Sequence, residues 1–371
     1  MAEHKRELDI AVIGAGVLGL STTEALLRRG ANVKCFDGRR PGSGQSGGLS
    51  RTFRHRHDDP HIVDLAARGL AGYREWERRS GVEMVGKEGC AYLGTTPADT
   101  TGLKTHQVPH HYAPAADRAE VFGALGPIDG PLLVDPTAGA LRVNHVIETL
   151  TGWVREHIIA NDIHSLLVLD NGKVEFQTAD AIYHARHVVL CAGVDTPRLA
   201  ARLGWDIPLD CALHARPHYR IREELRGAPT PCWVDKSGQF GEMVYGSVIP
   251  YTDQYVLGLI GDGVDVPFDA RGALTGEEGM EDHVRRVTGY VERALPGLIP
   301  EPIGVRVCIM SKLPAGSDAL RAWHAPGVTA IAGHNLFKFA PELGELLADS
   351  AVQDRLPADL ELAGARALGA A

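Results

Sequence analysis

The segment LDIAVIGAGVLGL, residues 8–20, decides the fold class of this 371-residue chain. Its largely apolar first half predicts a buried parallel strand. Gly14, Gly16 and Gly19 then form the pattern G-x-G-x-x-G at the start of a helical spacing. In this pattern the first glycine permits a tight turn, the second lets a pyrophosphate approach the backbone, and the third lets the helix pack on the strand. The free N–H groups at the helix start favour a phosphate, so the segment predicts dinucleotide binding.

The next strand supplies an acidic partner for this loop. ANVKCFDG, residues 31–38, reads as a strand, and Asp37 stands 18 residues beyond Gly19. A carboxylate at this place can accept hydrogen bonds from ribose hydroxyls. The glycines alone leave FAD and NAD open, and an NAD-linked dehydrogenase is one alternative. The later strand ending at Gly193 and a helix expected to start at Pro341 favour FAD, because a helix N-terminus stabilises negative charge on a reduced flavin.

Composition limits the other classes of function. The chain has 44% hydrophobic and 23% charged residues, as globular proteins do, and its net charge of −9 argues against a nucleic-acid partner. No apolar run approaches the length of a membrane span, and the N-terminal residues read as the start of a strand instead of a signal peptide. Six cysteines without a C-x-x-C pair fit neither a zinc site nor a disulfide framework. We therefore expect a cytoplasmic protein with no membrane partner and no metal.

The order of strand and helix patterns predicts the domain organisation. Blocks of alternating strands and helices at both ends and near the middle enclose stretches that read mainly as strands and turns. We expect an α/β protein whose Rossmann-like FAD-binding domain is assembled from 1–85, 142–213 and 303–371. Residues 86–141 and 214–302 would form a smaller α+β substrate-binding domain with a mixed, mostly antiparallel sheet.

Four segments in sequence order resemble the monomeric sarcosine oxidase and N-methyltryptophan oxidase family of FAD-dependent amine oxidoreductases. They are VIGAGVLGLS with Asp37, SGGLSRTFRH, VVLCAG, and VRVCIMSKLP together with AGHNLFKFAPELGE. The resemblance covers nearly the whole chain, and the second and fourth segments are the specific ones. It implies a flavin fold, oxidation of a small amine or amino acid, and a monomer.

The resemblance implies roles for the cationic residues and one cysteine. Cys308 matches the cysteine that is bonded through sulfur to the 8α-methyl group of FAD, although a packed core thiol is the alternative. Arg51 and Lys338 match catalytic groups, and Arg51 is expected near the flavin. Arg54 and Lys338 match the pair that binds the substrate carboxylate, and guanidinium is well suited to that task. Phe337 and Lys338 are also expected beside the cofactor.

Further pocket residues follow from the same comparison. Tyr245 and His334 match positions beside the substrate, and each could equally be an ordinary structural residue. Met310 stands where the family has a pocket tyrosine. His55, His57 and His61 are close in sequence, but no carboxylate pattern accompanies them, so we interpret them as surface or supporting residues.

The chain departs from the family at the position that reacts with oxygen. The family carries a lysine on the strand after the Tyr-Gly pair, but here 257–260 contain none, and the histidine that follows it is also absent. A cation there would stabilise superoxide. The loop around Lys338 is also shorter. These changes, with Met310, argue against sarcosine itself as the substrate.

The sequence therefore predicts FAD-dependent oxidation of the C–N bond of a small carboxylate-bearing amine to an imine, with O2 accepting the electrons and H2O2 released. Three alternatives remain. One is a flavoenzyme of the glycine or D-amino-acid oxidase type with non-covalent FAD. Another is a flavin dehydrogenase with a different acceptor. The third is a flavin-binding protein without catalysis.

Overall fold

The structure is a computed structural model that describes residues 5–261, 263–265, 280–314, 320–362 and 366–367. The chain divides into two compact units, which are described separately. The first unit contains 1–47, 144–211 and 311–371, and the second contains 48–143 and 212–310. The second unit is therefore the longer of the two, whereas the sequence predicted a smaller second domain. Segments 48–85 and 303–310, which the sequence analysis assigns to the FAD-binding domain, lie in the second unit.

The first unit is built on a mixed sheet that is mostly parallel at its centre. Strand β1 (Lys5–Ile13) pairs in parallel with β2 (Val33–Phe36) on one side and with β11 (Ile182–Leu190) on the other. The strand order is β20-β18-β19-β11-β1-β2-β8, and β10 and β9 extend from β11. The further strands are β8 Ile158–Ile159, β9 Ser165–Val168, β10 Val174–Gln177, β18 Leu320–Ala325, β19 Val328–Gly333 and β20 Arg366–Ala367.

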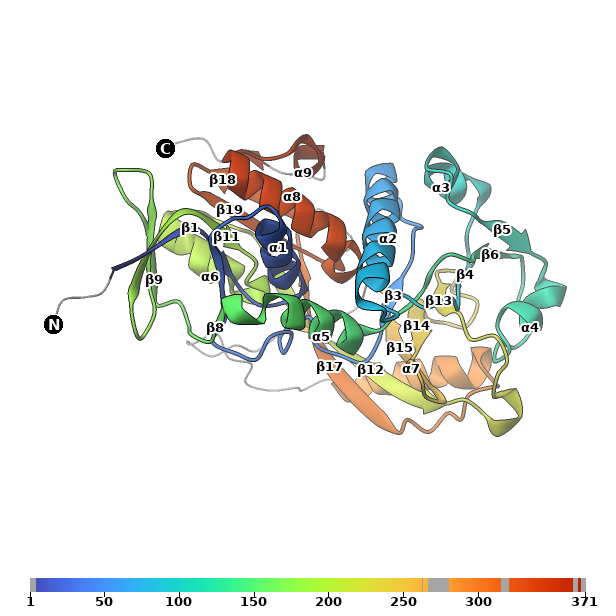
Figure 1. The fold of residues 1–371 in the computed structure, drawn as a ribbon. Coiled ribbons are helices and arrows are strands. Elements are labelled where there is room, and N and C mark those ends of the chain that lie inside the picture. The colour runs from blue at the N-terminus through green and yellow to red at the C-terminus, as the bar shows by residue number, and fades with distance from the viewer. Residues whose placement is uncertain (1–4, 262, 266–279, 315–319, 363–365, 368–371) are drawn as a thin grey trace. The chain divides into compact units, whose positions relative to one another are not determined.

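Helices α1 (Val17–Arg28) and α8 (Ala340–Gln353) lie side by side in this unit (Figure 1). The two helices approach closely because Gly344 has no side chain: a Cβ at that position would lie 1.8 Å from the hydroxyl oxygen of Ser21. That hydroxyl donates a hydrogen bond of 2.6 Å to the carbonyl of Ala340. The other helices of the unit are α5 Val143–Val154, α6 Thr196–Ala200 and α9 Ala358–Leu362.

The second unit contains a mostly antiparallel sheet. Its strand order is β16-β12-β15-β14-β13-β4-β6-β5, with β17 also paired to β12. Only the pair β13–β4 is parallel among the registered pairs of this sheet. The strands are β4 Cys90–Leu93, β5 His111–Ala113, β6 Leu132–Asp135, β12 Asp210–Arg220, β13 Cys232–Asp235, β14 Val244–Val248, β15 Gln254–Leu259, β16 Val264–Asp265 and β17 Gly304–Lys312.

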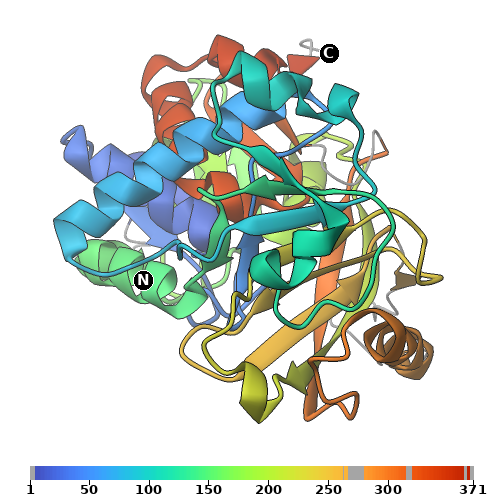
Figure 2. The ribbon, with the colours of Figure 1, turned by 90° about the vertical axis from the view of Figure 1, so that its right-hand side faces the viewer.

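Helices and a short two-stranded sheet complete the second unit. Figure 2 shows α7 (Met280–Ala294), in dark orange, beside the strands of the larger sheet. Helix α2 (Pro60–Ser80) begins where Asp59 accepts a hydrogen bond from the backbone of His61, and ends at Gly81 in the left-handed conformation with φ of 73°. The remaining elements are β3 Arg51–Phe53, β7 Gly139–Leu141, α3 Thr101–Thr105 and α4 Arg118–Val121. The predicted α/β class, with a mixed and mostly antiparallel sheet in the second unit, is therefore confirmed.

Candidate active site

Two positions admit only glycine: Gly14 in the loop between β1 and α1, and Gly19 in the first turn of α1. Gly14 has φ of +104°, and a Cβ there would lie 2.4 Å from the carbonyl oxygen of Cys191. A Cβ on Gly19 would lie 1.7 Å from the carbonyl oxygen of Gly14. The first glycine thus allows the turn and the third allows the helix to lie against the loop, as the sequence pattern predicts.

Asp37 and Ser46 fix this loop from outside. Oδ2 of Asp37 accepts a hydrogen bond of 2.8 Å from the backbone N–H of Ala15. Its Oδ1 accepts one of 2.8 Å from the backbone N–H of Arg39. Ser46 Oγ accepts the N–H of Val17, the first residue of α1, at 2.9 Å. The sequence analysis did not identify Ser46, whose only signal is its place in a segment rich in glycine and serine.

The first unit can hold the dinucleotide part of FAD. Gly16 itself carries no side chain, and the atom that a Cβ there would approach is Ser46 Oγ, at 3.1 Å. Gly193 lies directly after β11 with φ of +57°, and a Cβ there would be 2.7 Å from Gln45 Oε1. The cradle thus offers backbone N–H groups, which donate to a pyrophosphate, and one carboxylate, which accepts from ribose hydroxyls.

The segment between β19 and α8 carries three of the predicted residues. His334 is half-buried, whereas Phe337 and Lys338 are buried, with Lys338 only 4% exposed. The ammonium group of Lys338 lies 5.4 Å from the ring centre of Phe339, a cation–π distance. A lysine held this deeply is costly unless a charge or ring compensates it.

Arg51 lies in the second unit among other charged and polar groups. It is the first residue of β3, and its Nη1 donates to the carbonyl of Ser50 at 3.0 Å. Burial and the neighbouring charge of Arg216 lower the pKa of Arg51 to about 10, while Cys308 and Tyr245 act in the opposite direction. The structure therefore brings three predicted residues, Arg51, Tyr245 and Cys308, into one electrostatic neighbourhood.

Tyr245 on β14 belongs to a pair that the sequence analysis did not identify. Its hydroxyl lies 3.1 Å from Nδ1 of His214, whose Nε2 lies 3.0 Å from the carbonyl oxygen of Leu259. If Nε2 carries the proton and donates it to that carbonyl, Nδ1 is left to accept from the phenol. Burial raises the pKa of Tyr245, and Arg216 opposes that rise. The guanidinium carbon of Arg216 lies 5.5 Å from the tyrosine ring centre.

Cys308 and Met310 are two residues apart on β17. Cys308 is a free, half-buried cysteine, and Met310 is buried. Residues i and i+2 of a strand point to the same face, so both lie on the face of β17 that carries Arg306. On β15, Leu257 is fully buried, and it lies in the stretch 257–260, where the resemblance leads us to expect a lysine and the sequence has none.

Arg54 follows β3 and is half-buried. Its Nη1 donates to the carbonyl of Arg56 and lies 3.5 Å from Nδ1 of His57. Arg54 lies in the second unit, whereas Lys338, its predicted partner in carboxylate binding, lies in the first unit.

The three clustered histidines have separate surroundings. His55 is buried, and its Nδ1 lies 2.8 Å from the buried carboxylate of Asp135. Burial opposes ionisation of Asp135, but the hydrogen bonds from His55 and Thr137 prevail and lower its pKa. His61 is exposed at the start of α2.

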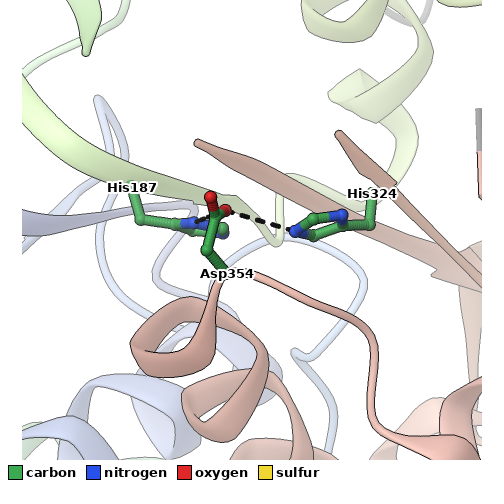
Figure 3. A group of neighbouring side chains, drawn as sticks. All are labelled: His187, His324 and Asp354. Atoms are coloured by element: carbon green, nitrogen blue, oxygen red, sulfur yellow. Dashed lines mark hydrogen bonds and ion pairs between the residues drawn. The ribbon is translucent and has the colours of Figure 1, made fainter. Parts of the chain in front are cut away.

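A second histidine group lies in the first unit, where Asp354 follows α8. The carboxylate oxygen Oδ1 of Asp354 lies 3.1 Å from Nδ1 of His187 and 3.3 Å from Nε2 of His324 (Figure 3). Three possible ligand atoms are therefore within 4.8 Å of one another, close enough to surround a metal ion. The same Oδ1 accepts the N–H of Gly327 at 2.8 Å, and Nε2 of His187 lies 2.9 Å from the hydroxyl of Thr329. These contacts account for the group as a structural network that ties the end of α8 to β11, β18 and the β18–β19 turn.

No helix within the described ranges has both the length and the apolar character needed to cross a bilayer. The six cysteines are all free.

Comparison with known proteins gives matches over almost the entire chain. The model of the DAO family, described as FAD dependent oxidoreductase, matches residues 9–350. Monomeric sarcosine oxidase of Streptomyces avermitilis is 26% identical, with 98% of each chain covered. Among solved structures, NikD, an amino acid oxidase essential for nikkomycin biosynthesis, superimposes with a TM-score of 0.83 at 20% identity over 96% of this chain and 97% of NikD. L-proline dehydrogenase from P. horikoshii gives 0.80 at 18% identity over 95% and 96%.

Proposed function

The chain belongs to the DAO family of FAD-dependent oxidoreductases, and from this premise we propose that it oxidises the C–N bond of a small carboxylate-bearing amine to an imine. It is a flavin-dependent amine oxidoreductase. In the proposed reaction the substrate carbon loses a hydride equivalent, the nitrogen loses a proton, O2 is consumed and H2O2 is released. Water then hydrolyses the imine. The substrate is a primary, secondary or cyclic amino acid other than sarcosine.

The residues of the first unit would hold FAD. Gly14, Gly16 and Gly19 leave room for its pyrophosphate, Asp37 accepts from its ribose, and Gly193 lets the chain pass close to it. When bound, FAD supplies the two-electron chemistry that no side chain can perform. This division of tasks leaves orientation of the substrate and exclusion of water to the protein.

We assign the substrate carboxylate to Arg54 and Lys338. A bidentate guanidinium fixes the direction of a carboxylate, and a buried ammonium adds attraction in a medium of low dielectric. With the carboxylate held, the amine nitrogen and its neighbouring carbon have a fixed orientation, which is the main contribution a protein makes in such a reaction. His334, Tyr245 and Met310 would contact the rest of the substrate.

The observation that carries the proposal is that Arg51 and Tyr245 share Arg216 and Cys308 as neighbours in the second unit, with the guanidinium carbon of Arg216 5.5 Å from the Tyr245 ring centre. A cationic surrounding stabilises negative charge that develops on an electron-accepting ligand, which supports a catalytic task for Arg51. Cys308 is accessible enough to form the covalent bond to FAD that we propose. Phe337 and Lys338 would also contact the cofactor. The free cysteines support a cytoplasmic location.

A second candidate is a dehydrogenase that passes electrons to an acceptor other than O2. The stretch 257–260 favours it, because it contains no lysine to provide the cation expected beside oxygen, and its Leu257 is fully buried. Mixing the amine-reduced enzyme with air-saturated buffer separates the two: reoxidation within seconds supports the oxidase, and reoxidation over many minutes supports the dehydrogenase.

The test of the proposed function is anaerobic reduction of the bound flavin by a panel of amino acids and their decarboxylated amines. Bleaching of the flavin absorbance by members that carry a carboxylate supports the proposal. If none of these amines reduces the flavin, the proposed activity is wrong, and the chain is a flavin-binding protein without it.

A further inference from the structure

A cavity of about 390 Å³ lies entirely within the second unit, beside β12 and β17. Two arginines, Arg216 and Arg306, contribute to its wall, together with His218 and Ser50. The remaining wall is aliphatic and consists of Leu49, Ile249, Val256, Val305 and Val307. Neither Arg54 nor any residue of the first unit lines it, so the cavity differs from the carboxylate clamp proposed above.

Arg216 is buried without the partners that a guanidinium needs. The residue is 4% exposed, and Nη1 donates to the carbonyl of Ser50 at 3.3 Å. Its Nε and Nη2 atoms are fully buried and have no hydrogen-bond partner within the part of the chain that the structure describes. A buried cation with unused donors is unfavourable, because the donors lose water and gain nothing in return.

The surroundings of Arg216 add positive charge. Arg306, half-buried on β17, also has a buried Nε without a partner among the described residues. Burial and the charges of Arg216 and Arg306 lower the pKa of His218, which keeps this imidazole neutral. Arg51 is a further cation whose pKa both arginines depress. The cavity wall therefore carries two guanidinium groups and includes no carboxylate.

We propose that this cavity is a binding site for a small aliphatic carboxylate, with Arg216 and Arg306 as its anion-binding residues. The planar guanidinium donors match the two oxygens of a carboxylate, and the five aliphatic side chains match a short apolar body. The volume lies in the range of small-molecule sites. An inorganic anion can accept hydrogen bonds from the arginines but makes no contact with the aliphatic wall. It should therefore bind more weakly than an aliphatic carboxylate.

The experiment is calorimetric titration of the flavin-loaded protein, as purified, with sodium butyrate, butyramide and sodium sulfate in a low-chloride buffer. We expect butyrate to bind, butyramide not to bind, and sulfate to bind at least several-fold more weakly than butyrate. Arg216→Met should weaken butyrate binding at least tenfold, and Arg306→Met several-fold. Arg220→Met changes an exposed arginine on the same strand and should leave the affinity unchanged.

Thermal unfolding without added carboxylate separates a ligand-binding arginine from a structural one. Arg216→Met should unfold at the same or a higher temperature than the parent protein, because it removes a buried charge whose Nε and Nη2 have no hydrogen-bond partner among the described residues. The proposal would be overturned if the parent protein does not bind butyrate and Arg216→Met unfolds at a lower temperature than the parent. Loss of butyrate binding in Arg54→Met but not in Arg216→Met would also overturn it, and would place the carboxylate at the proposed clamp.

Discussion

Asp37 and Ala15 are joined by a hydrogen bond of 2.8 Å from the backbone N–H to the carboxylate oxygen Oδ2. The bond connects the end of β2 to the glycine loop, so this acid shapes the loop as well as facing the ribose in the proposed complex. Gly14 adds a second link, because its N–H donates to the carbonyl of Phe36 at 2.8 Å. The loop that would hold the pyrophosphate is thus positioned by the second strand.

Replacing Asp37 tests this double role. Asp37→Ala should weaken FAD binding by about ten- to a hundredfold, because a hydrogen bond to a charged group contributes about 1.5–3 kcal/mol. Asp37→Asn should lie between Asp37→Ala and the parent, since an amide oxygen can still accept from Ala15. Fluorescence titration with FAD in a Cys308→Ala background measures the affinity. Asp9→Ala, at an exposed position on β1, serves as the control, and equal affinities for Asp37→Ala and the control would refute the role.

Cys308→Ala should release flavin that is otherwise attached to the chain. After acid precipitation, we expect the yellow colour to stay with the pellet of the parent protein and to move to the supernatant of the variant. Cys211→Ala, which changes another half-buried free cysteine, should behave like the parent. Colour in the supernatant of the parent itself would return Cys308 to the status of a packed thiol and favour non-covalent FAD.

Removing Arg54 or Lys338 should lower kcat/KM for amino acid substrates and not for amines that lack a carboxylate. For an amino acid substrate, Arg54→Met and Lys338→Met should each lower kcat/KM by about ten- to a hundredfold, the value of one hydrogen bond to a charged group. For the decarboxylated amine the two variants and the parent should differ little. Steady-state kinetics on the matched pair of substrates measures this, with Arg220→Met as the control. An equal loss for both substrates would show that the variants disturb something other than carboxylate binding.

The histidine network at the end of α8 predicts a pH dependence of stability. Burial lowers the pKa of His187 to about 4, although Asp354 opposes this shift. Below pH 6.5 the unfolded chain binds a proton that the folded chain refuses, so stability should fall as the pH drops from 6.5 to about 4, by at most about 3 kcal/mol. The pKa of Asp354 is also lowered, which adds a loss of stability at still lower pH.

Denaturant unfolding at several pH values between 7 and 4 measures this dependence. His187→Gln should be less stable than the parent at pH 7 but should lose less stability on acidification. His61→Gln, at an exposed position, should follow the parent curve. Parallel curves for His187→Gln and the parent would contradict the assigned pKa shift.

The first unit could be predicted from the sequence because its signals are local. The glycines at 14, 16 and 19 and the strand that ends at Phe36 are adjacent in the chain, and their spacing defines one βαβ unit. The network of His187, His324 and Asp354 could not be predicted in the same way, because its members are far apart in sequence and meet only when three elements pack together.

The second unit shows the same limit more clearly. Tyr245 was identified through a resemblance, but its partner His214 depends on the antiparallel order β12-β15-β14, which no local pattern reveals. Arg216 was missed because it lies in the run CALHARPHYR, where an arginine gives no sign of being buried. Its proximity to Arg51, more than 150 residues earlier in the chain, arises only when β12 and the two-stranded sheet of β3 and β7 pack together.

The central claim is that this flavoprotein oxidises amines through recognition of their carboxylate. The most direct measurement is the rate of anaerobic flavin reduction by an amino acid, compared with the rate for its decarboxylated amine, in the parent protein and in Arg54→Met. We predict that the parent reacts faster with the amino acid and that Arg54→Met removes most of this preference. If the decarboxylated amine reduces the flavin as fast as the amino acid in the parent protein, carboxylate recognition is wrong.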